Sequence, residues 1–90
     1  MYELIYTNQF KHSLKRCVKR GLDVRLLQDV LDKLQDEGKL PQQYSPHKLV
    51  GKYKGCWECY IQSDWLLVWQ QNDKALYLIL LDTGSHADLF

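Results

Sequence analysis

The chain has 90 residues, of which 46% are hydrophobic and 26% are charged, and its formal net charge is +1. This length predicts one small domain over residues 1–90, and the composition is that of an ordinary globular protein. No apolar run approaches the ~20 residues that a membrane span needs, and the first residues lack the pattern of a signal peptide. We therefore expect a cytoplasmic protein that has no membrane partner.

The first part of the chain predicts one strand and two helices. Residues 2–6 alternate in polarity and are rich in aromatic and β-branched side chains, which is typical of a strand. Between Phe10 and Val18, apolar side chains recur at helical spacing on an otherwise basic segment, and Gly21 can end this helix. A second amphipathic pattern covers about residues 23–37. Because the break between them is short, the two helices should form an antiparallel hairpin.

The second part of the chain predicts strands. Residues 47–51 and 52–61 have strand composition and are separated by a predicted turn. Residues 64–70 and 75–81 are apolar at nearly every position, so we expect two central strands that are covered on both faces. The predicted fold class is α+β: an N-terminal strand, an α-helical hairpin, and then an antiparallel sheet of three to four strands with the hairpin on one face.

The three cysteines predict neither a disulfide framework nor a metal site. An odd number of cysteines fits a reducing compartment. Cys56 and Cys59 form a C-x-x-C, but in a strand this spacing places the two thiols on opposite faces. We therefore expect two small, half-buried side chains there, and we predict no metal and no other cofactor.

Charge is distributed unevenly between the two predicted helices. Acidic residues dominate residues 28–37, whereas basic residues dominate the segment before them, namely Lys11, Lys15, Arg16, Lys19, Arg20 and Arg25. The two charged surfaces could complement each other or simply face solvent. Alternatively, the basic surface could meet nucleic acid or an acidic partner.

Candidate groups for catalysis are few. The histidines are His12, His47 and His86, and none shows the spacing of a metal site. His12 lies among the lysines of the first helix, where we expect a solvated position. His47 and His86 could converge at one edge of the sheet with Asp64 and Tyr60, a set that suits acid–base chemistry near neutral pH. The alternative is that His47 and His86 only satisfy backbone groups in loops.

Four segments carry the motifs of a known family. They are His47-Lys48-Leu49-x-Gly51, Lys54-Gly55, Tyr60-Ile61-x-x-Asp64-Trp65-Leu66-Leu67 and Thr83-Gly84-Ser85-His86-x-Asp88-Leu89-Phe90. In these motifs the sequence resembles the YafQ branch of the RelE/ParE toxin superfamily, and the likeness extends over nearly the whole chain. The order of strand, helical hairpin and sheet predicted above fits the fold of that family.

The resemblance implies a toxin of a type II toxin–antitoxin pair, an endoribonuclease that cuts mRNA in the ribosomal A site without a metal ion. The implied partners are a cognate antitoxin protein, the ribosome with its mRNA, and operator DNA bound through the antitoxin complex. By position, His86 is implied as acid or base, and His47 and Asp64 are implied in proton transfer or in orienting the substrate. Phe90 and Trp65 are implied to hold bases, since aromatic stacking is worth ~1–3 kcal/mol per base.

Two residues depart from the pattern of that family. Tyr60 stands where close relatives have a histidine in a strand, and Asp82 stands where they have an arginine. A tyrosine can donate a proton but is a poor base, because its ordinary pKa is ~10. An arginine would stabilise charge on the reacting phosphate. Tyr60 still belongs to the expected catalytic set, and the missing positive charge could come from Lys48, Lys52 and Lys54.

These departures leave alternative functions open. The chain could be a toxin-fold module that has little catalytic activity, binds its antitoxin and helps to regulate its operon. A gyrase-inhibiting relative of the same fold would have no need of the His47 and His86 pair.

Overall fold

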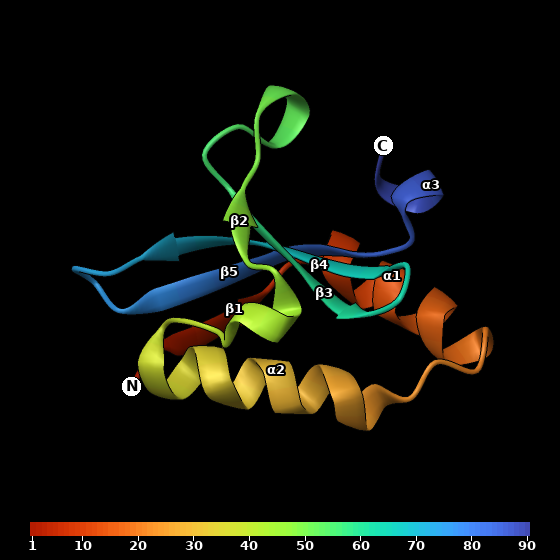
Figure 1. Cartoon of the computed structure of the whole chain (residues 1–90), viewed down its shortest axis with the longest axis horizontal. Helices are drawn as coiled ribbons and strands as arrows, with labels where there is room; N and C mark the ends of the chain where they lie inside the picture. The colour runs from red at the N-terminus through yellow and green to blue at the C-terminus, as the bar shows by residue number, and fades with distance from the viewer.

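A computed structural model describes residues 1–90 and has the α+β architecture expected from the sequence (Figure 1). In chain order the elements are β1 (Glu3–Tyr6), α1 (Asn8–Lys19), α2 (Val24–Glu37), β2 (His47–Lys48), β3 (Trp57–Gln62), β4 (Trp65–Asn72), β5 (Tyr77–Gly84) and α3 (His86–Leu89). Two short 3-10 helices, Gln42–Tyr44 and Gly51–Tyr53, lie in the connection between α2 and β3. None of these helices has the length and apolar character that a membrane-spanning helix requires.

The five strands form one twisted sheet in the order β1-β5-β4-β3-β2. The strands β2 to β5 pair in antiparallel fashion, as predicted. The two most apolar segments, β4 and β5, take the central positions that were expected of them. β1 pairs in parallel with β5, so the first strand of the chain lies at one edge of the sheet beside the last strand.

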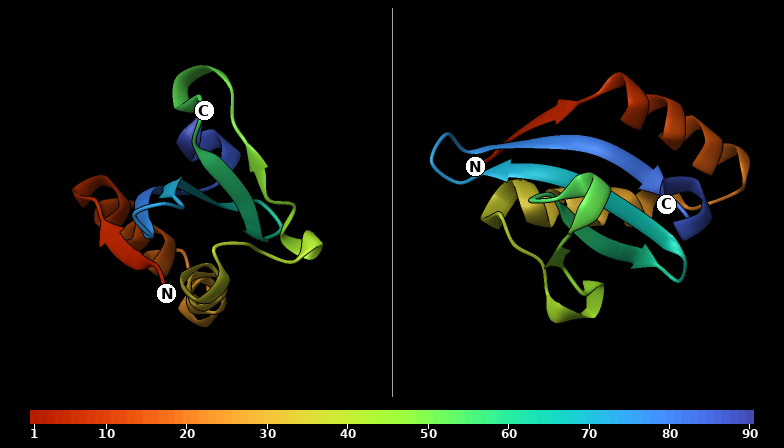
Figure 2. Two further views of the ribbon diagram at one scale, coloured as in Figure 1. Left: turned by 90° about the vertical axis from the view of Figure 1, so that its left-hand side faces the viewer. Right: turned by 90° about the horizontal axis from the view of Figure 1, so that it is seen from above.

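Both long helices bury their apolar sides against the same face of the sheet. The Thr7 side chain caps α1 by accepting a hydrogen bond from the Phe10 N–H, and Asp23 caps α2 through the Arg25 N–H. α1 packs on β5 and α2 packs on β3, and the chain reverses direction between the two helices (Figure 2). The resulting core contains Phe10, Cys17, Leu27, Val30, Leu31, Leu34, Cys59, Ile61, Trp65, Leu67, Trp69, Leu78 and Leu80.

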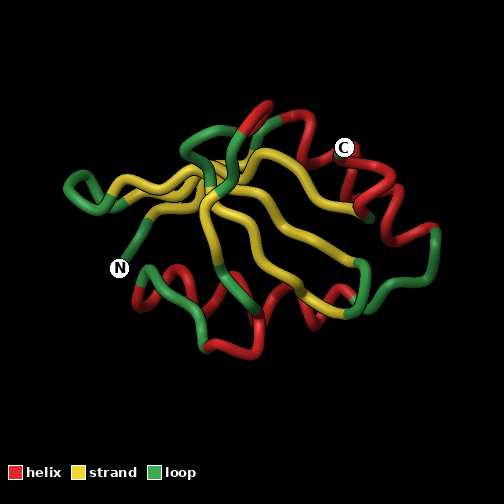
Figure 3. Tube along the Cα trace, turned by 45° about the horizontal axis from the view of Figure 1, so that its top comes forward, coloured by secondary structure: helices red, strands yellow, loops and turns green.

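The opposite face of the sheet is covered only in part. There, Leu66 and Val68 of β4 and Leu89 of α3 form a second, smaller buried cluster. Residues 49–56 and α3 flank this cluster, and Figure 3 shows both on the side of the sheet away from α2. Polar side chains can therefore reach solvent on this face, whereas the helices cover the other face.

The connection from β2 to β3 differs from the prediction of two long strands. β2 has only two residues, and the second predicted strand begins at Trp57. The cause is a loop in which Gly51 and Gly55 have φ angles of 76° and 85°, a conformation that interrupts regular pairing. The Leu49 N–H donates to the Cys56 carbonyl oxygen and thereby closes the loop.

The two cysteines of the C-x-x-C point to opposite faces of the sheet, as their spacing predicts. Cys59 is buried in the main core, and this burial raises the pKa of its thiol to about 12. Cys56 packs against the second cluster on the other face. Two thiols placed in this way cannot share one metal ion or form one disulfide.

Candidate active site

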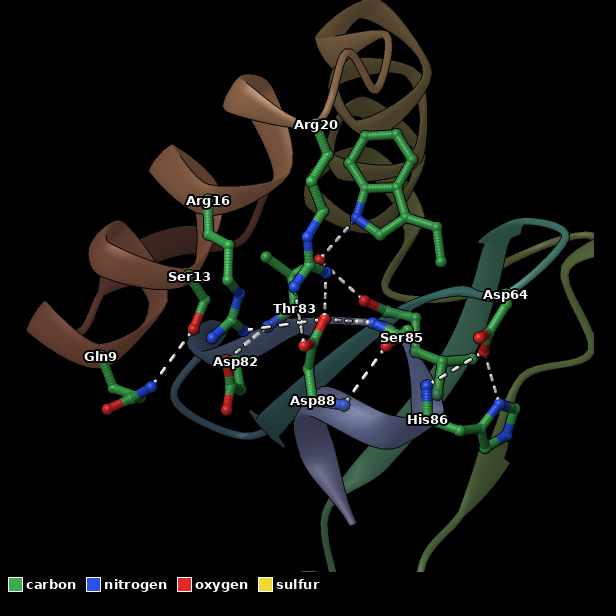
Figure 4. Close-up of polar contacts among 12 residues, drawn as sticks. Gln9, Ser13, Arg16, Arg20, Asp64, Asp82, Thr83, Ser85, His86 and Asp88 are labelled. Atoms are coloured by element: carbon green, nitrogen blue, oxygen red, sulfur yellow. Dashed lines mark hydrogen bonds and ion pairs between the residues drawn. The ribbon is translucent and has the colours of Figure 1, made fainter.

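The side chains predicted to carry catalysis meet on the partly covered face, where β5 ends and α3 begins. His86 is the first residue of α3, and Asp64 lies in the turn between β3 and β4. The Asp64 Oδ1 atom faces His86 Nδ1 at 2.6 Å and accepts the His86 backbone N–H at 3.0 Å (Figure 4). These contacts, the backbone hydrogen bond first, hold the pKa of Asp64 below its ordinary value.

This geometry determines which ring nitrogen of His86 is free. Nδ1 faces a carboxylate oxygen and therefore carries a hydrogen, so Nε2 of the neutral ring has a free lone pair. The Tyr60 hydroxyl lies 3.3 Å from Nε2 and can donate to it. The His86 side chain is 53% exposed, which leaves Nε2 accessible to a substrate. The arrangement is that of a general base oriented by a carboxylate.

The second predicted histidine, His47, belongs to a separate pair with Glu58. His47 Nε2 lies 3.0 Å from Glu58 Oε1, and His47 Nδ1 lies 2.7 Å from the Ser45 carbonyl oxygen. Both ring nitrogens thus face oxygen acceptors, and each needs a hydrogen for both contacts to be hydrogen bonds. The Glu58 side chain is only 4% exposed, and its Oε2 atom has no partner.

The Tyr60 ring lies between the two histidines. Its centroid is 5.7 Å from the His86 ring and 6.5 Å from the His47 ring. The structure therefore brings together all four residues of the predicted catalytic set. Two histidines, each paired with a carboxylate, flank one tyrosine.

Phe90 and Lys52, two of the predicted substrate-binding residues, extend the site on one side. The exposed Phe90 ring lies 6.4 Å from the His86 ring and makes an edge contact with Tyr53 at 5.9 Å. The Lys52 Nζ atom lies 5.2 Å from the centre of the Tyr53 ring. Phe90 and Tyr53 therefore form an aromatic surface next to His86, and the Lys52 ammonium group lies at its far side.

Trp65 does not lie where a base-binding role requires it. Its side chain is buried in the main core, on the face covered by the helices, and the residue is only 2% exposed. The indole N–H donates to the Thr83 hydroxyl at 2.9 Å, and Thr83 in turn donates to the Leu66 carbonyl oxygen. The alternation along β4 directs this side chain inward, so base binding by Trp65 stays a prediction that would require the side chain to move.

The predicted lysines are not grouped around the site either. Lys48 follows His47 on β2 and therefore points to the opposite face, where its Nζ atom lies 5.7 Å from the centre of the Trp57 ring. Lys54 is exposed in the loop before β3. Lys52 alone among the three lies over an aromatic ring that is continuous with the site.

Asp82 is buried on β5. Its Oδ1 atom accepts a hydrogen bond from the Thr83 backbone N–H at 2.8 Å. In the register of the sheet it lies opposite Val68, on the same face as the site. No lysine or arginine forms a salt bridge with it.

A further acidic residue, Asp88, connects the site to α1. Two atoms of the Arg20 guanidinium group contact its carboxylate, at 2.6 Å and 3.1 Å (Figure 4). The contact with Arg20, followed by the hydrogen bond from the Ser85 backbone N–H, holds the pKa of Asp88 far below its ordinary value. Part of the positive charge at the end of α1 is therefore paired with a carboxylate of the same chain.

The sequence matches a family described as bacterial toxin of type II toxin–antitoxin system, YafQ, over residues 2–90. The chain belongs to the YafQ toxin family. The mRNA interferase toxin YafQ of Escherichia coli K12 is 32% identical over 89 residues, which are 98% of this chain and 95% of that protein.

Solved structures of related toxins share the whole fold. A metal-bound toxin from Helicobacter pylori has a TM-score of 0.89 at 37% identity, and the match covers 100% of both chains. The YafQ-type chain in the E. coli DinJ-YafQ complex has a TM-score of 0.89 at 30% identity, and the match covers 100% of this chain and 99% of that chain. The α+β fold of this YafQ toxin is therefore that of its family.

The histidine and carboxylate groups of this YafQ toxin form pairs rather than a cluster of three. No three His, Cys, Asp or Glu side chains come together in a geometry that could hold a metal ion. The histidine nitrogens of the site instead contact Asp64, Glu58, the Tyr60 hydroxyl and a carbonyl oxygen.

Two contacts of the YafQ site are not evident from the sequence. Glu58 becomes the partner of His47 only through the pairing of β2 with β3, in which the two residues are opposite each other. Asp88 lies within the tail motif, but its partner Arg20 is 68 positions away. No local pattern connects residues at that separation.

We expect the contact between Asp88 and Arg20 to survive acidification to below pH ~3.9, the ordinary pKa of an aspartate. Because folding lowers the pKa of Asp88, the contact stabilises the fold fully above that value and is lost as pH falls through the lower folded-state pKa. Carboxyl carbon NMR of the folded chain, compared with the chain in urea, measures both titrations. An Asp88 carboxyl group that titrates at the same pH in both would contradict the expectation.

Proposed function

We propose that this YafQ-family toxin is an endoribonuclease that cuts mRNA on the ribosome by metal-independent acid–base chemistry. The observation that carries the proposal is the array of Asp64, His86 and Tyr60. The Asp64 carboxylate holds the His86 ring at Nδ1, and the ring presents Nε2, with the Tyr60 hydroxyl beside it, on an exposed face. Such an array can remove one proton and supply another within a single reaction.

In the proposed reaction, His86 Nε2 takes the proton of a ribose 2′-hydroxyl group. The 2′-oxygen then attacks the adjacent phosphorus, and the bond from phosphorus to the 5′-oxygen breaks. Tyr60 gives its hydroxyl proton to the leaving 5′-oxygen. The proton on His86 then returns to the Tyr60 oxygen across the 3.3 Å contact, which restores both groups. The products are a 2′,3′-cyclic phosphate and a 5′-hydroxyl end.

His47 and Glu58 complete the proposed site. The contacts with Glu58 and the Ser45 carbonyl oxygen fix the His47 ring beside Tyr60, and we assign His47 a role in orienting the substrate. Phe90 is proposed to stack on a base, and Lys52 to contact a neighbouring phosphate.

The proposed partners follow from the relatives and from the substrate. The E. coli relative forms a complex with DinJ, and we propose that this toxin likewise binds a cognate antitoxin. Its site of action would be the ribosome with mRNA in the A site, in the cytoplasm. Operator DNA would be bound through the antitoxin complex.

The test uses the purified chain in a translating extract with an end-labelled mRNA, and naked RNA serves as the ribosome-free lane. We expect discrete cuts, mapped by primer extension, in the translated RNA only. Mass spectrometry of the cut ends should show cyclic phosphate and 5′-hydroxyl groups. Ends that carry a 5′-phosphate would contradict the proposed chemistry, and cuts of equal strength in naked RNA would contradict the dependence on the ribosome.

A second candidate function rests on Asp82, a buried carboxylate on the face of the site where phosphate charge would develop. In that case the chain is a catalytically weak module that binds its antitoxin and regulates its operon. A folded chain that binds the antitoxin but makes no cuts would favour this candidate. A DNA-damage response on expression, without cuts, would instead indicate a gyrase-inhibiting relative.

A further inference from the structure

The C-terminal helix α3, which carries His86, depends on contacts outside itself. A helix of four residues is not stable alone, because one turn does not offset the cost of nucleation. Leu89 anchors one side of α3 in the cluster with Leu66 and Val68. On the other side, the Asp88 carboxylate accepts the Ser85 backbone N–H at 2.9 Å, and the Ser85 hydroxyl accepts the Asp88 N–H at 3.2 Å.

The Asp88 carboxylate is in turn held by the end of α1. Arg20 Nη1 lies 2.6 Å from Oδ2 and Arg20 Nη2 lies 3.1 Å from Oδ1, a two-pronged contact (Figure 4). Arg16 Nη2 lies 3.9 Å from Oδ2 on the same side. The carboxylate also lies directly against Gly84. A Cβ atom added at Gly84 would lie 2.7 Å from Oδ2, so the close approach requires a glycine there. The Asp88 side chain is only 12% exposed, so this position is well defined.

We propose that Arg20 is a positioning residue, which holds α3 through Asp88 so that His86 keeps its contact with Asp64. His86 and Asp88 lie in the same single turn, so that a displacement of Asp88 moves His86 as well. The His86 backbone N–H and Nδ1 both face one oxygen atom of Asp64, and a small rotation of the turn breaks both contacts. The expected effect on cleavage rests on the proposed function, whereas the position of His86 can be measured without RNA.

The experiment removes the Arg20–Asp88 contact from each side. Arg20→Met deletes the guanidinium group, and Asp88→Asn removes the charge but keeps an oxygen for the Ser85 N–H. Because a misplacement of about 1 Å can cost ~10²-fold in rate, we expect each variant to cut ~10–100-fold more slowly in the translating extract. The double variant should be no slower than the single ones, since all remove the same contact.

Arg25→Met is the matched control. Arg25 makes a similar two-pronged contact with Asp23, at the start of α2 and outside the site. This variant should cut at the wild-type rate. Arg20→Lys, which keeps the charge without the planar fork, should restore part of the activity that Arg20→Met loses.

The ¹⁵N NMR spectrum of the His86 ring provides the readout that a merely structural role would not change. In the wild-type chain the contact with Asp64 favours the hydrogen on Nδ1. We expect Arg20→Met and Asp88→Asn to shift the hydrogen toward Nε2, and Arg25→Met to leave it on Nδ1. An unchanged tautomer in both site variants would overturn the proposal, even if cleavage fell. If the wild-type chain cuts no RNA but the tautomer still shifts in the two site variants, the positioning role is supported and only the nuclease function is contradicted.

Discussion

His86→Gln should lower ribosome-dependent cleavage by ~10²–10⁴-fold, the usual contribution of a general acid or base, and should abolish growth inhibition. Glutamine can fill the space of the imidazole and accept a hydrogen bond, but it cannot take a proton from a 2′-hydroxyl group near neutral pH. The fold should be retained, because the His86 side chain is exposed and α3 keeps its anchors at Leu89 and Asp88. Primer extension on translated mRNA and induction in growing cells measure the two effects.

His12→Gln is the control for this prediction. His12 is exposed on α1, away from the residues that form the site, so this variant should cut as the wild type does. A circular dichroism spectrum shows whether both variants are folded. If a folded His86→Gln chain cut within a few-fold of the wild-type rate, His86 could not be the proton acceptor.

Trp65→Ala should destabilise the fold by ~3–5 kcal/mol, the usual cost of truncating a buried large aromatic residue. The Trp65 side chain packs in the core under both helices, and its indole N–H is hydrogen-bonded to Thr83. A domain of this size has a total stability of only ~5–15 kcal/mol, so much of the chain could unfold. Urea denaturation followed by circular dichroism measures the loss.

Trp65→Phe separates this structural role from a role in base binding. The ring is kept and the hydrogen bond to Thr83 is lost, so the cost should be smaller, and the folded fraction should cut mRNA at the wild-type rate. A stable Trp65→Phe chain with a large loss of cleavage would instead show that the indole contacts RNA. Trp65 would then have to leave the core when the substrate binds.

The sequence predicted those parts of the fold that depend on local patterns. The stripes of apolar residues located α1 and α2, and the continuous apolar runs located β4 and β5 in the centre of the sheet. The loop after β2 was missed because its course depends on the positive φ angles of Gly51 and Gly55 and on contacts with the second cluster. Residues 52–61 taken together have strand composition, but tertiary packing overrides it in residues 52–56.

The site was predictable where motif residues are also the residues in contact, as with His86, Asp64 and Tyr60. It was less predictable where a residue's role depends on the face of the sheet to which its side chain points. A shift by one residue separates His47, which faces Glu58, from Lys48, which lies over Trp57. The contact between Arg20 and Asp88 joins two distant segments, and only the assembled fold reveals it.

The parallel pairing of β1 with β5 has a consequence for how the toxin folds. β1 is the first strand to leave the ribosome, and it pairs only with β5, the last strand to be made. The sheet therefore cannot be completed while β5 is still being synthesised. α1 would meanwhile lack the strand on which it packs. Contacts between such distant segments slow folding and prolong the exposure of apolar surface. During that interval the nascent chain would be without an assembled site and harmless to the cell, and it would be open to capture by chaperones or proteases.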